Sequence, residues 1–313
     1  MHGVINLLKP PGMTSHDAVA FVRRVLKNKR VGHTGTLDPA AAGVLPICVG
    51  QATRLAEYLQ AGTKEYLAEA TFGFETDTLD AVGQTIREAE TSQINLESLR
   101  AALDGFRGEI TQTPPLFSAI KQDGKKLYEI ARAGGQTEIK SRKVTISKLE
   151  VTRFTEGEHP RAMLHIECSG GTYIRSLVRD LAIALGSAAT MTFLVRSRSG
   201  GFVLDEAVSC EEFAANPTLI PFQEAISWCA RNIYENDDAT RSLWHGKLAT
   251  APKPEELTPQ TDEKLQTRRV HTESPKNSLV IHNAAKDVFA LAIPSRETGF
   301  YRAEKVFDLR ISE

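Results

Sequence analysis

The segment Val31–Pro46 holds the residues best suited to chemistry, because glycine, threonine and histidine precede the pair Asp38-Pro39. A carboxylate such as that of Asp38 can act as a nucleophile and later be expelled, as covalent catalysis requires. Pro39 favours an extended backbone at Asp38, and the glycines allow tight turns. Composition alone indicates no more than an Asp-Pro turn and a structural His33. No Gly-Lys-Ser/Thr follows, so this is not a phosphate-binding loop of that type.

Basic residues near this segment are a second chemical feature. The chain has a net charge of −1 and a pI of about 6.7, which by itself argues against a nucleic-acid partner. The charge is unevenly distributed, however, with +4 on residues 1–60 and +5 on residues 101–200. It is concentrated in Arg23–Arg30 and Lys121–Lys148. Such runs are usually solvated faces, and the alternative is a surface that binds phosphate groups.

The remaining composition excludes several classes of protein. The four cysteines have neither C-x-x-C nor zinc-finger spacing, so we expect reduced thiols, a cytoplasmic protein and no structural metal. The apolar N-terminal stretch is too short for a signal peptide. No run of about 18 apolar residues occurs, so no membrane span is expected. With 41% hydrophobic and 25% charged residues, the chain is typical of soluble globular proteins.

Regular elements are predicted on both sides of the Asp38 segment. Thr14-x-x-Asp17 is a variant of a capping box, so a helix is expected after the turn Lys9–Gly12. Asn95 is the expected cap of a second helix. The spacing of apolar residues predicts helices at Leu96–Asp104, Lys125–Ala133 and Tyr173–Leu185. It predicts strands at Gly3–Leu8, Val44–Val49, Tyr66–Phe72, Val144–Phe154, Ala162–Cys168, Met191–Val195 and Phe202–Leu204. Loops are predicted at residues 31–43 and at Glu75–Gly83.

The order of these elements lacks a strict alternation of strand and helix. We therefore predict an α+β fold with a mixed or largely antiparallel sheet. A boundary is expected within Asn232–Thr240, which divides the chain into residues 1–232 and a β-rich module of residues 233–313. Within this module, short strands are predicted at Ser278–Ile281, Val288–Ile293 and Phe300–Phe307, after a polar, proline-containing loop.

Several short motifs, taken by residue identity and by their order along the chain, add evidence to these patterns. The segment around Asp38 resembles the signature motif of the TruB family of pseudouridine synthases. Colinear motifs extend the resemblance over about 190 residues: Lys9–Ser15, Gly50–Arg54, Lys64–Tyr66, Thr76–Asp80, Pro115–Lys121, Gly124–Tyr128, Cys168–Arg175 and Leu194–Arg196. The resemblance implies a pseudouridine synthase catalytic domain with an RNA-clamping insertion at about residues 115–148. It also implies a small PUA-like RNA-binding domain at the C-terminus.

The resemblance assigns three catalytic residues. Asp38 matches the essential aspartate, although the sequence leaves open attack at C1′, attack at C6 and a glycal intermediate. Arg175 matches the arginine that pairs with this aspartate, where the alternative is a surface arginine. We place Arg179, one turn later, at the surface. Tyr66 matches the tyrosine that stacks on the target uracil, yet its alternation with Ala68 also suits a core position.

Substrate-binding residues follow from the same resemblance. His33 matches the histidine that helps to displace the target base, and flipping a base costs a few kcal/mol. Leu194 resembles a leucine beside the flipped base, or is an ordinary core leucine. Asp80 resembles a motif aspartate near the active site. The remaining residues assigned to RNA binding are basic: Lys9, Lys121, Lys125 and Lys126.

The resemblance implies a cytoplasmic isomerase that makes pseudouridine 55 in the T-loop of tRNA by base flipping and covalent catalysis. No metal or organic cofactor is expected, since the carboxylate performs the covalent step. The expected partner is the T-arm stem-loop, and we expect a monomer that does not associate with membranes. Two alternatives stay open: a tRNA-folding chaperone with incidental catalysis, and a guide-dependent synthase of the dyskerin type.

Overall fold

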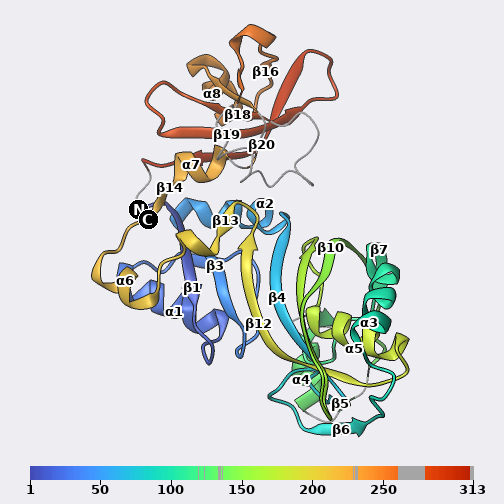
Figure 1. The fold of residues 1–313 in the computed structure, drawn as a ribbon. Coiled ribbons are helices and arrows are strands. Elements are labelled where there is room, and N and C mark those ends of the chain that lie inside the picture. The colour runs from blue at the N-terminus through green and yellow to red at the C-terminus, as the bar shows by residue number, and fades with distance from the viewer. Residues whose placement is uncertain are drawn as a thin grey trace. The chain divides into compact units, whose positions relative to one another are not determined.

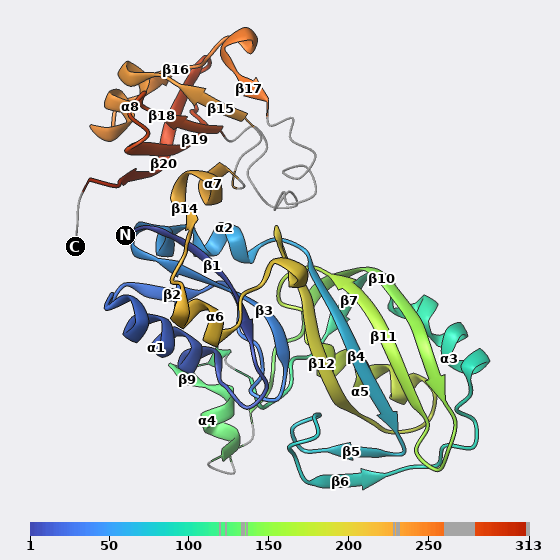
Figure 2. The same ribbon diagram turned by 60° about the vertical axis from the view of Figure 1, so that its left-hand side comes forward.

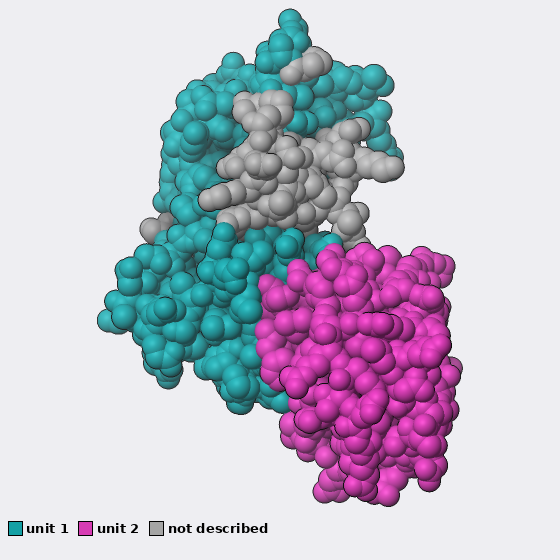
Figure 3. Space-filling model, in the orientation of Figure 1, with its two compact units in different colours: residues 1–63, 198–313 teal, residues 64–197 magenta. Residues whose placement is uncertain are grey.

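The computed structural model describes residues 1–310 except 119, 123, 133, 134, 136, 228, 230, 231 and 260–278. The chain forms two compact units (Figure 3). Unit 1 combines residues 1–63 with residues 198–313, and unit 2 is the continuous segment 64–197. No helix in the described part of the chain is both long enough and apolar enough to cross a membrane.

The N-terminal part of unit 1 is an antiparallel sheet with helices packed beside it (Figures 1 and 2). Its strand order is β14-β1-β3, and β2 also pairs with β3. The elements are β1 (Gly3–Lys9), α1 (Ser15–Leu26), β2 (Val31–His33), β3 (Ala42–Val49), α2 (Ala56–Gln60), β13 (Phe202–Val203), α6 (Cys210–Ala215), β14 (Ile220–Pro221) and α7 (Phe222–Ser227). The predicted capping box of α1 is present: Thr14 accepts from the Asp17 backbone, and the Asp17 carboxylate accepts from that of Thr14.

The C-terminal part of unit 1 is a separate six-stranded sheet in the order β16-β20-β19-β18-β15-β17. Its elements are β15 (Asn232–Glu235), α8 (Asp237–Trp244), β16 (Ala249–Thr250), β17 (Thr258–Pro259), β18 (Leu279–His282), β19 (Val288–Pro294) and β20 (Phe300–Asp308). The predicted β-rich module is thus confirmed as a sheet, consistent with the expected PUA-like fold. The position of a domain boundary near residue 232 stays a prediction; β15 and α8 lie in that interval.

One hydrophobic core joins the two sheets of unit 1. Phe222 of α7 lies between Phe289 and Phe307, with ring-centroid distances of 5.5 and 5.0 Å. The same cluster contains residues of the N-terminal part, among them Val4 and Leu55. Polar contacts reinforce it, since the ammonium of Lys305 donates to the Arg54 carbonyl and forms an ion pair with Glu57.

Five strands of unit 2 belong to its main sheet, in the order β12-β4-β11-β10-β7, and the pairs β5-β6 and β8-β9 form two small sheets. Its elements are β4 (Lys64–Phe72), β5 (Phe74–Thr76), β6 (Thr85–Glu88), α3 (Leu96–Leu103), β7 (Gly108–Gln112), β8 (Lys121–Gln122), β9 (Lys125–Lys126), α4 (Leu127–Arg132), β10 (Arg142–Thr155), β11 (Arg161–Cys168), α5 (Ile174–Ala184) and β12 (Ala189–Ser199), whose last two residues belong to unit 1. β10 pairs antiparallel with both β11 and β7. The predicted α+β class with a largely antiparallel sheet is confirmed.

Three predicted elements differ from the structure. The loop predicted at Glu75–Gly83 begins as β5, which pairs with the exposed strand β6. Val31–His33 is a strand, because it pairs with β3. The helix predicted at Lys125–Ala133 starts only at Leu127, because Lys125 and Lys126 pair with β8; its predicted C-terminal end lies outside the described residues.

Candidate active site

The loop 34–41, which connects β2 to β3 and carries Asp38, is held by its neighbours in unit 1. The Ser15 hydroxyl accepts from the Leu37 backbone N–H at 2.9 Å and donates to the Leu37 carbonyl at 3.1 Å. The Ala41 N–H donates to the Asp38 carbonyl at 3.1 Å, which closes a turn at Asp38-Pro39. Leu37 is buried while Asp38 is partly exposed. The carboxylate is therefore carried by a fixed backbone that is open to a substrate.

Lys9 lies beneath this turn and is fully buried. Its ammonium donates to the carbonyls of Pro10, Met13 and Pro39 at 2.9, 2.8 and 3.3 Å. The Gly12 N–H also donates to the Pro39 carbonyl, at 2.8 Å. The sequence assigned Lys9 to substrate binding; these contacts give it a structural role in fixing the turn after Asp38. Its part in binding substrate remains a prediction.

His33, at the end of β2, is partly exposed at the start of the same loop. Its Nδ1 accepts from the Gly35 backbone N–H at 3.2 Å, which assigns the proton of a neutral ring to Nε2. The His16 ring contacts it edge-on at 5.9 Å between centroids. The structure thus brings three predicted residues, Lys9, His33 and Asp38, to one loop cluster of unit 1.

A second group of predicted residues meets in unit 2. Arg175, in the first turn of α5, is 4% exposed. Its guanidinium donates to the carbonyls of Thr78 at 2.8 Å and Phe117 at 3.0 Å. One carboxylate oxygen of Asp80 lies 3.6 Å from the Arg175 Nη1 atom. The surface alternative for Arg175 is therefore wrong, and the expectation that this side chain reaches inward is confirmed.

Asp80 is itself tightly held. Its Oδ1 accepts from the Thr78 hydroxyl at 2.7 Å and from the Val82 N–H at 3.1 Å, which leaves Oδ2 facing Arg175. Leu79, just before it, has a φ of 62°, a left-handed conformation that a leucine adopts only under constraint. The loop thus fixes Asp80 as an ionic partner of Arg175, a pairing that the sequence did not reveal.

The other predicted residues of unit 2 lie on adjacent strands. Tyr66 on β4 and Leu194 on β12 are both buried. The predicted alternation of Tyr66 with Ala68, Ala70 and Phe72 is confirmed, which agrees with the core alternative; the stacking role remains a prediction. Arg179 faces further outward than Arg175, as expected, although contacts with Asp180 and the Thr113 carbonyl leave it only one-fifth exposed.

Lys64, in the same strand as Tyr66, is a site residue that the sequence did not single out. It is 5% exposed, and its ammonium has no hydrogen-bond partner in the described part of the chain. Burial, followed by repulsion from the buried guanidinium of Arg196, lowers the pKa of Lys64 to about 7. Both residues fall within matched motifs, but their shared burial depends on strand neighbours that lie far apart in sequence.

The insertion lysines are described only through their backbone. Lys121 is the register partner of Lys126 in the β8–β9 hairpin. Their role, like that of Lys125, remains a prediction. A basic hollow of about 510 Å³ lies elsewhere, at the end of α1, where it is lined by Arg23, Lys27, Asn28 and Lys29. It confirms that part of the first basic run gathers on one surface.

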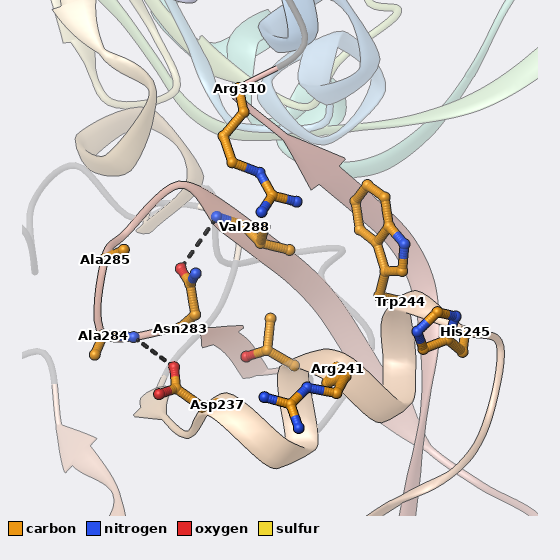
Figure 4. A pocket seen from close by; sticks show the side chains of 10 residues that line it. Asp237, Arg241, Trp244, His245, Asn283, Ala284, Ala285, Val288 and Arg310 are labelled. Carbon is orange, nitrogen blue, oxygen red and sulfur yellow. Dashed lines mark hydrogen bonds between the residues drawn. The ribbon is translucent and has the colours of Figure 1, made fainter.

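A second hollow, of about 580 Å³, lies on the C-terminal sheet of unit 1 (Figure 4). Trp244 is 40% exposed, and the Arg310 guanidinium carbon lies 5.9 Å from its ring centroid. Asp308 orients Arg310 through two hydrogen bonds of 2.8 and 2.7 Å, and Arg310 in turn lowers the pKa of Asp308. An exposed indole beside a fixed guanidinium is suited to stacking on an unpaired base.

Only one group in the described residues has metal-ligand geometry. Ligand atoms of Glu65, His165 and Glu167 lie within 4.8 Å of one another on β4 and β11. His165 and Glu65 already bond to each other at 2.9 Å. This contact explains the group as part of a charged sheet surface, and we assign no metal site to it.

Comparison with known proteins agrees with this architecture. Residues 23–174 match the family described as TruB family pseudouridylate synthase (N terminal domain). The "tRNA pseudouridine synthase B" of Symbiobacterium thermophilum is 50% identical over 245 residues, which cover 78% of this chain and 82% of that protein. That of Synechocystis sp. is 45% identical over 258 residues, or 80% and 86% of the two chains.

A solved structure shares the fold as well. It is titled "Crystal Structure of a Cbf5-Nop10-Gar1 Complex", with a TM-score of 0.68 and 26% identity, and the match covers 98% of this chain and 85% of that chain. The fold and the two residue groups thus define the pseudouridine synthase class. Within this class, the chain belongs to the TruB family.

Proposed function

We propose that this protein converts uridine 55 in the T-loop of tRNA to pseudouridine. The observation that carries the proposal is the partly exposed carboxylate of Asp38 on a backbone fixed by Ser15 and Lys9, in a chain of the TruB family. The reaction breaks the N1–C1′ bond, turns the uracil and forms a C5–C1′ bond. N1 gains a proton and C5 loses one, so no redox partner is needed.

Each residue receives one role in this proposal. Asp38 supplies the covalent nucleophile, and Arg175 is the cation that keeps this aspartate ionised and oriented. Tyr66 and Leu194 hold the flipped uracil, and His33 takes part in displacing it from the loop. The contacts of Arg175 with two carbonyls and with Asp80 support its role, because a guanidinium held on several sides has a defined orientation.

The substrate-binding surface is proposed to extend beyond these residues. The basic hollow on α1 and the insertion lysines would contact phosphates, and the Trp244 hollow would take an unpaired base. We further propose that the protein acts as a cytoplasmic monomer, with a catalytic domain of residues 1–232 and a PUA-like domain of residues 233–313. Recognition of the T-arm would then depend on loop shape and splayed bases more than on duplex sequence.

The decisive experiment uses the purified chain and an unmodified tRNA transcript, without added protein or guide RNA. Pseudouridine should appear at position 55, and a transcript with cytidine there should yield none. Asp38→Asn should lose turnover while still binding tRNA. Product from the isolated chain would exclude the guide-dependent alternative. Binding without any product would favour the folding chaperone, and turnover by Asp38→Asn would refute the assignment of the nucleophile.

A further inference from the structure

The first turn of α5, which carries Arg175, is held from outside the helix. Tyr173 precedes the helix in an extended conformation, and no side chain of its own caps the helix. The side chain of Gln112, at the end of β7, instead holds the backbone of this N-cap residue. Its Nε2 donates to the Tyr173 carbonyl at 3.0 Å, and its Oε1 accepts from the Tyr173 N–H at 2.7 Å.

The Gln112 amide makes these contacts in complete burial, at 0% exposure. Arg142, its register partner on β10, stacks on the ring of the same tyrosine, with its guanidinium carbon 4.6 Å from the ring centroid. Gln112 and Arg142 thus flank the segment 113–141, and both contact Tyr173. The structure connects residues on both sides of segment 113–141, which overlaps the predicted RNA-clamping insertion, to the N-cap residue of α5.

The segment after Gln112 makes further contacts with the first turn of α5. The Thr113 carbonyl accepts from the Ser176 hydroxyl at 2.8 Å, and the Phe117 carbonyl accepts from Arg175 itself at 3.0 Å. A helix terminus without such partners frays, and Arg175 is only the second residue of α5. Loss of the Gln112 contacts would take its acceptor from the half-buried Tyr173 N–H and leave the Tyr173 carbonyl only the Leu177 N–H, at a position two residues before Arg175.

We infer that Gln112 is a positioning residue for Arg175: its side-chain amide fixes Tyr173 and thereby the orientation of the guanidinium used in the reaction. This inference rests on the proposed function, in which Arg175 orients the reactive aspartate. Gln112 contacts neither substrate nor reacting atoms. Replacement of Gln112 should therefore slow the chemical step and leave RNA binding unchanged.

The test compares Gln112→Leu with Gln93→Leu. Gln93 is a matched control, because its exposed side chain donates to the carbonyls of Leu185 and Gly186 at the other end of the same helix. Gln112→Leu should lower kcat on tRNA on the order of 100-fold, the loss that a misplacement of about 1 Å causes, with KM changed less than about 2-fold. Gln93→Leu should leave both constants close to wild type.

A double-mutant cycle separates positioning from a general loss of structure. In an Arg175→Lys background, Gln112→Leu should add little further loss of kcat, because the group it positions is already altered. Full additivity of the two losses, or a loss confined to KM, would overturn the inference. Denaturant unfolding of each variant establishes that the kinetics are measured on folded protein.

A readout without turnover keeps this inference distinct from the proposed function. Crystal structures of wild type and Gln112→Leu should differ in the hydrogen bonds from Arg175 to Thr78 and Phe117. An unmoved Arg175 guanidinium in Gln112→Leu would overturn the inference even if wild type proved active. A displaced guanidinium would support the positioning role of Gln112 even if wild type formed no pseudouridine. The absence of product would then refute the proposed function and leave the positioning role standing.

Discussion

Replacement of Lys64 by methionine should stabilise the protein, and the gain should depend on pH. Methionine keeps an unbranched chain of similar length but carries no charge. The wild-type ammonium is buried beside the Arg196 guanidinium without a hydrogen-bond partner in the described residues. Folding must either bury this charge without a counter-ion or remove its proton, and both cost free energy, so replacement of Lys64 is favourable at every pH below its ordinary pKa.

The size and sign follow from proton linkage. The pKa of Lys64 falls from 10.5 to about 7 on folding. Between these values, the unfolded chain binds a proton that the folded protein does not, so wild-type stability rises by about 1.4 kcal/mol per pH unit. The cost of Lys64 is fully present below pH ~7 and disappears as the pH approaches ~10.5. Because Lys64 is half protonated in the folded protein at pH 7, the advantage of Lys64→Met should shrink by roughly 2 kcal/mol between pH 7 and pH 9.

The assay is urea unfolding of wild type and Lys64→Met at pH 6, 7, 8 and 9, followed by circular dichroism. Because other ionisable groups are common to both proteins, their contributions cancel in the difference. Lys148→Met is the control, since the side chain of Lys148 is 37% exposed and forms an ion pair with Glu150 at 3.4 Å. A stability difference that stays flat over this range, or increases with pH, would refute the reasoning.

Three further predictions concern the core, a helix cap and RNA binding. Phe222→Ala should lower the free energy of unfolding of unit 1 by about 3–5 kcal/mol, because Phe222 is buried between Phe289 and Phe307; a loss below ~1 kcal/mol in urea unfolding would contradict this. Thr14→Ala should cost about 0.5–2 kcal/mol through the lost cap of α1, seen as a lower Tm, whereas an unchanged Tm would argue that the cap contributes nothing. Binding of a T-arm stem-loop should weaken steeply with salt, with a slope of about −0.9 in log K against log [salt] per duplex phosphate contacted; a flat response would exclude the basic surfaces as the binding site.

Local signals in the sequence predicted most elements. The capping box at Thr14 and the cap at Asn95 mark helix starts through contacts within three residues, and both are present. The alternation from Tyr66 to Phe72 predicts a half-buried strand for a similarly local reason. Short, exposed β6 packs neither face on a core, so it carries no such pattern and no strand was predicted there.

The sequence indicated which residues belong to the candidate site but not which contacts they make with one another. Arg175 was expected to reach inward, but its ionic contact with Asp80 depends on a left-handed turn at Leu79 that no local pattern specifies. Gln112 was missed because its partner, Tyr173, is 61 positions away in the chain. The buried charge of Lys64 likewise arises from the adjacency of β4 and β12, which hydrophobic periodicity does not encode.

The divided core of unit 1 has a consequence for how the protein is made on the ribosome. Residues 1–63 cannot complete their hydrophobic core until Phe222 and the C-terminal strands are available. At a synthesis rate of ~5–20 residues per second, the ribosome spends roughly 7 to 27 s on residues 64–197 alone. Unit 2 is continuous and can fold during that interval. The N-terminal strands β1 and β3 therefore keep apolar surface uncovered during translation until the strands that complete their core have been made.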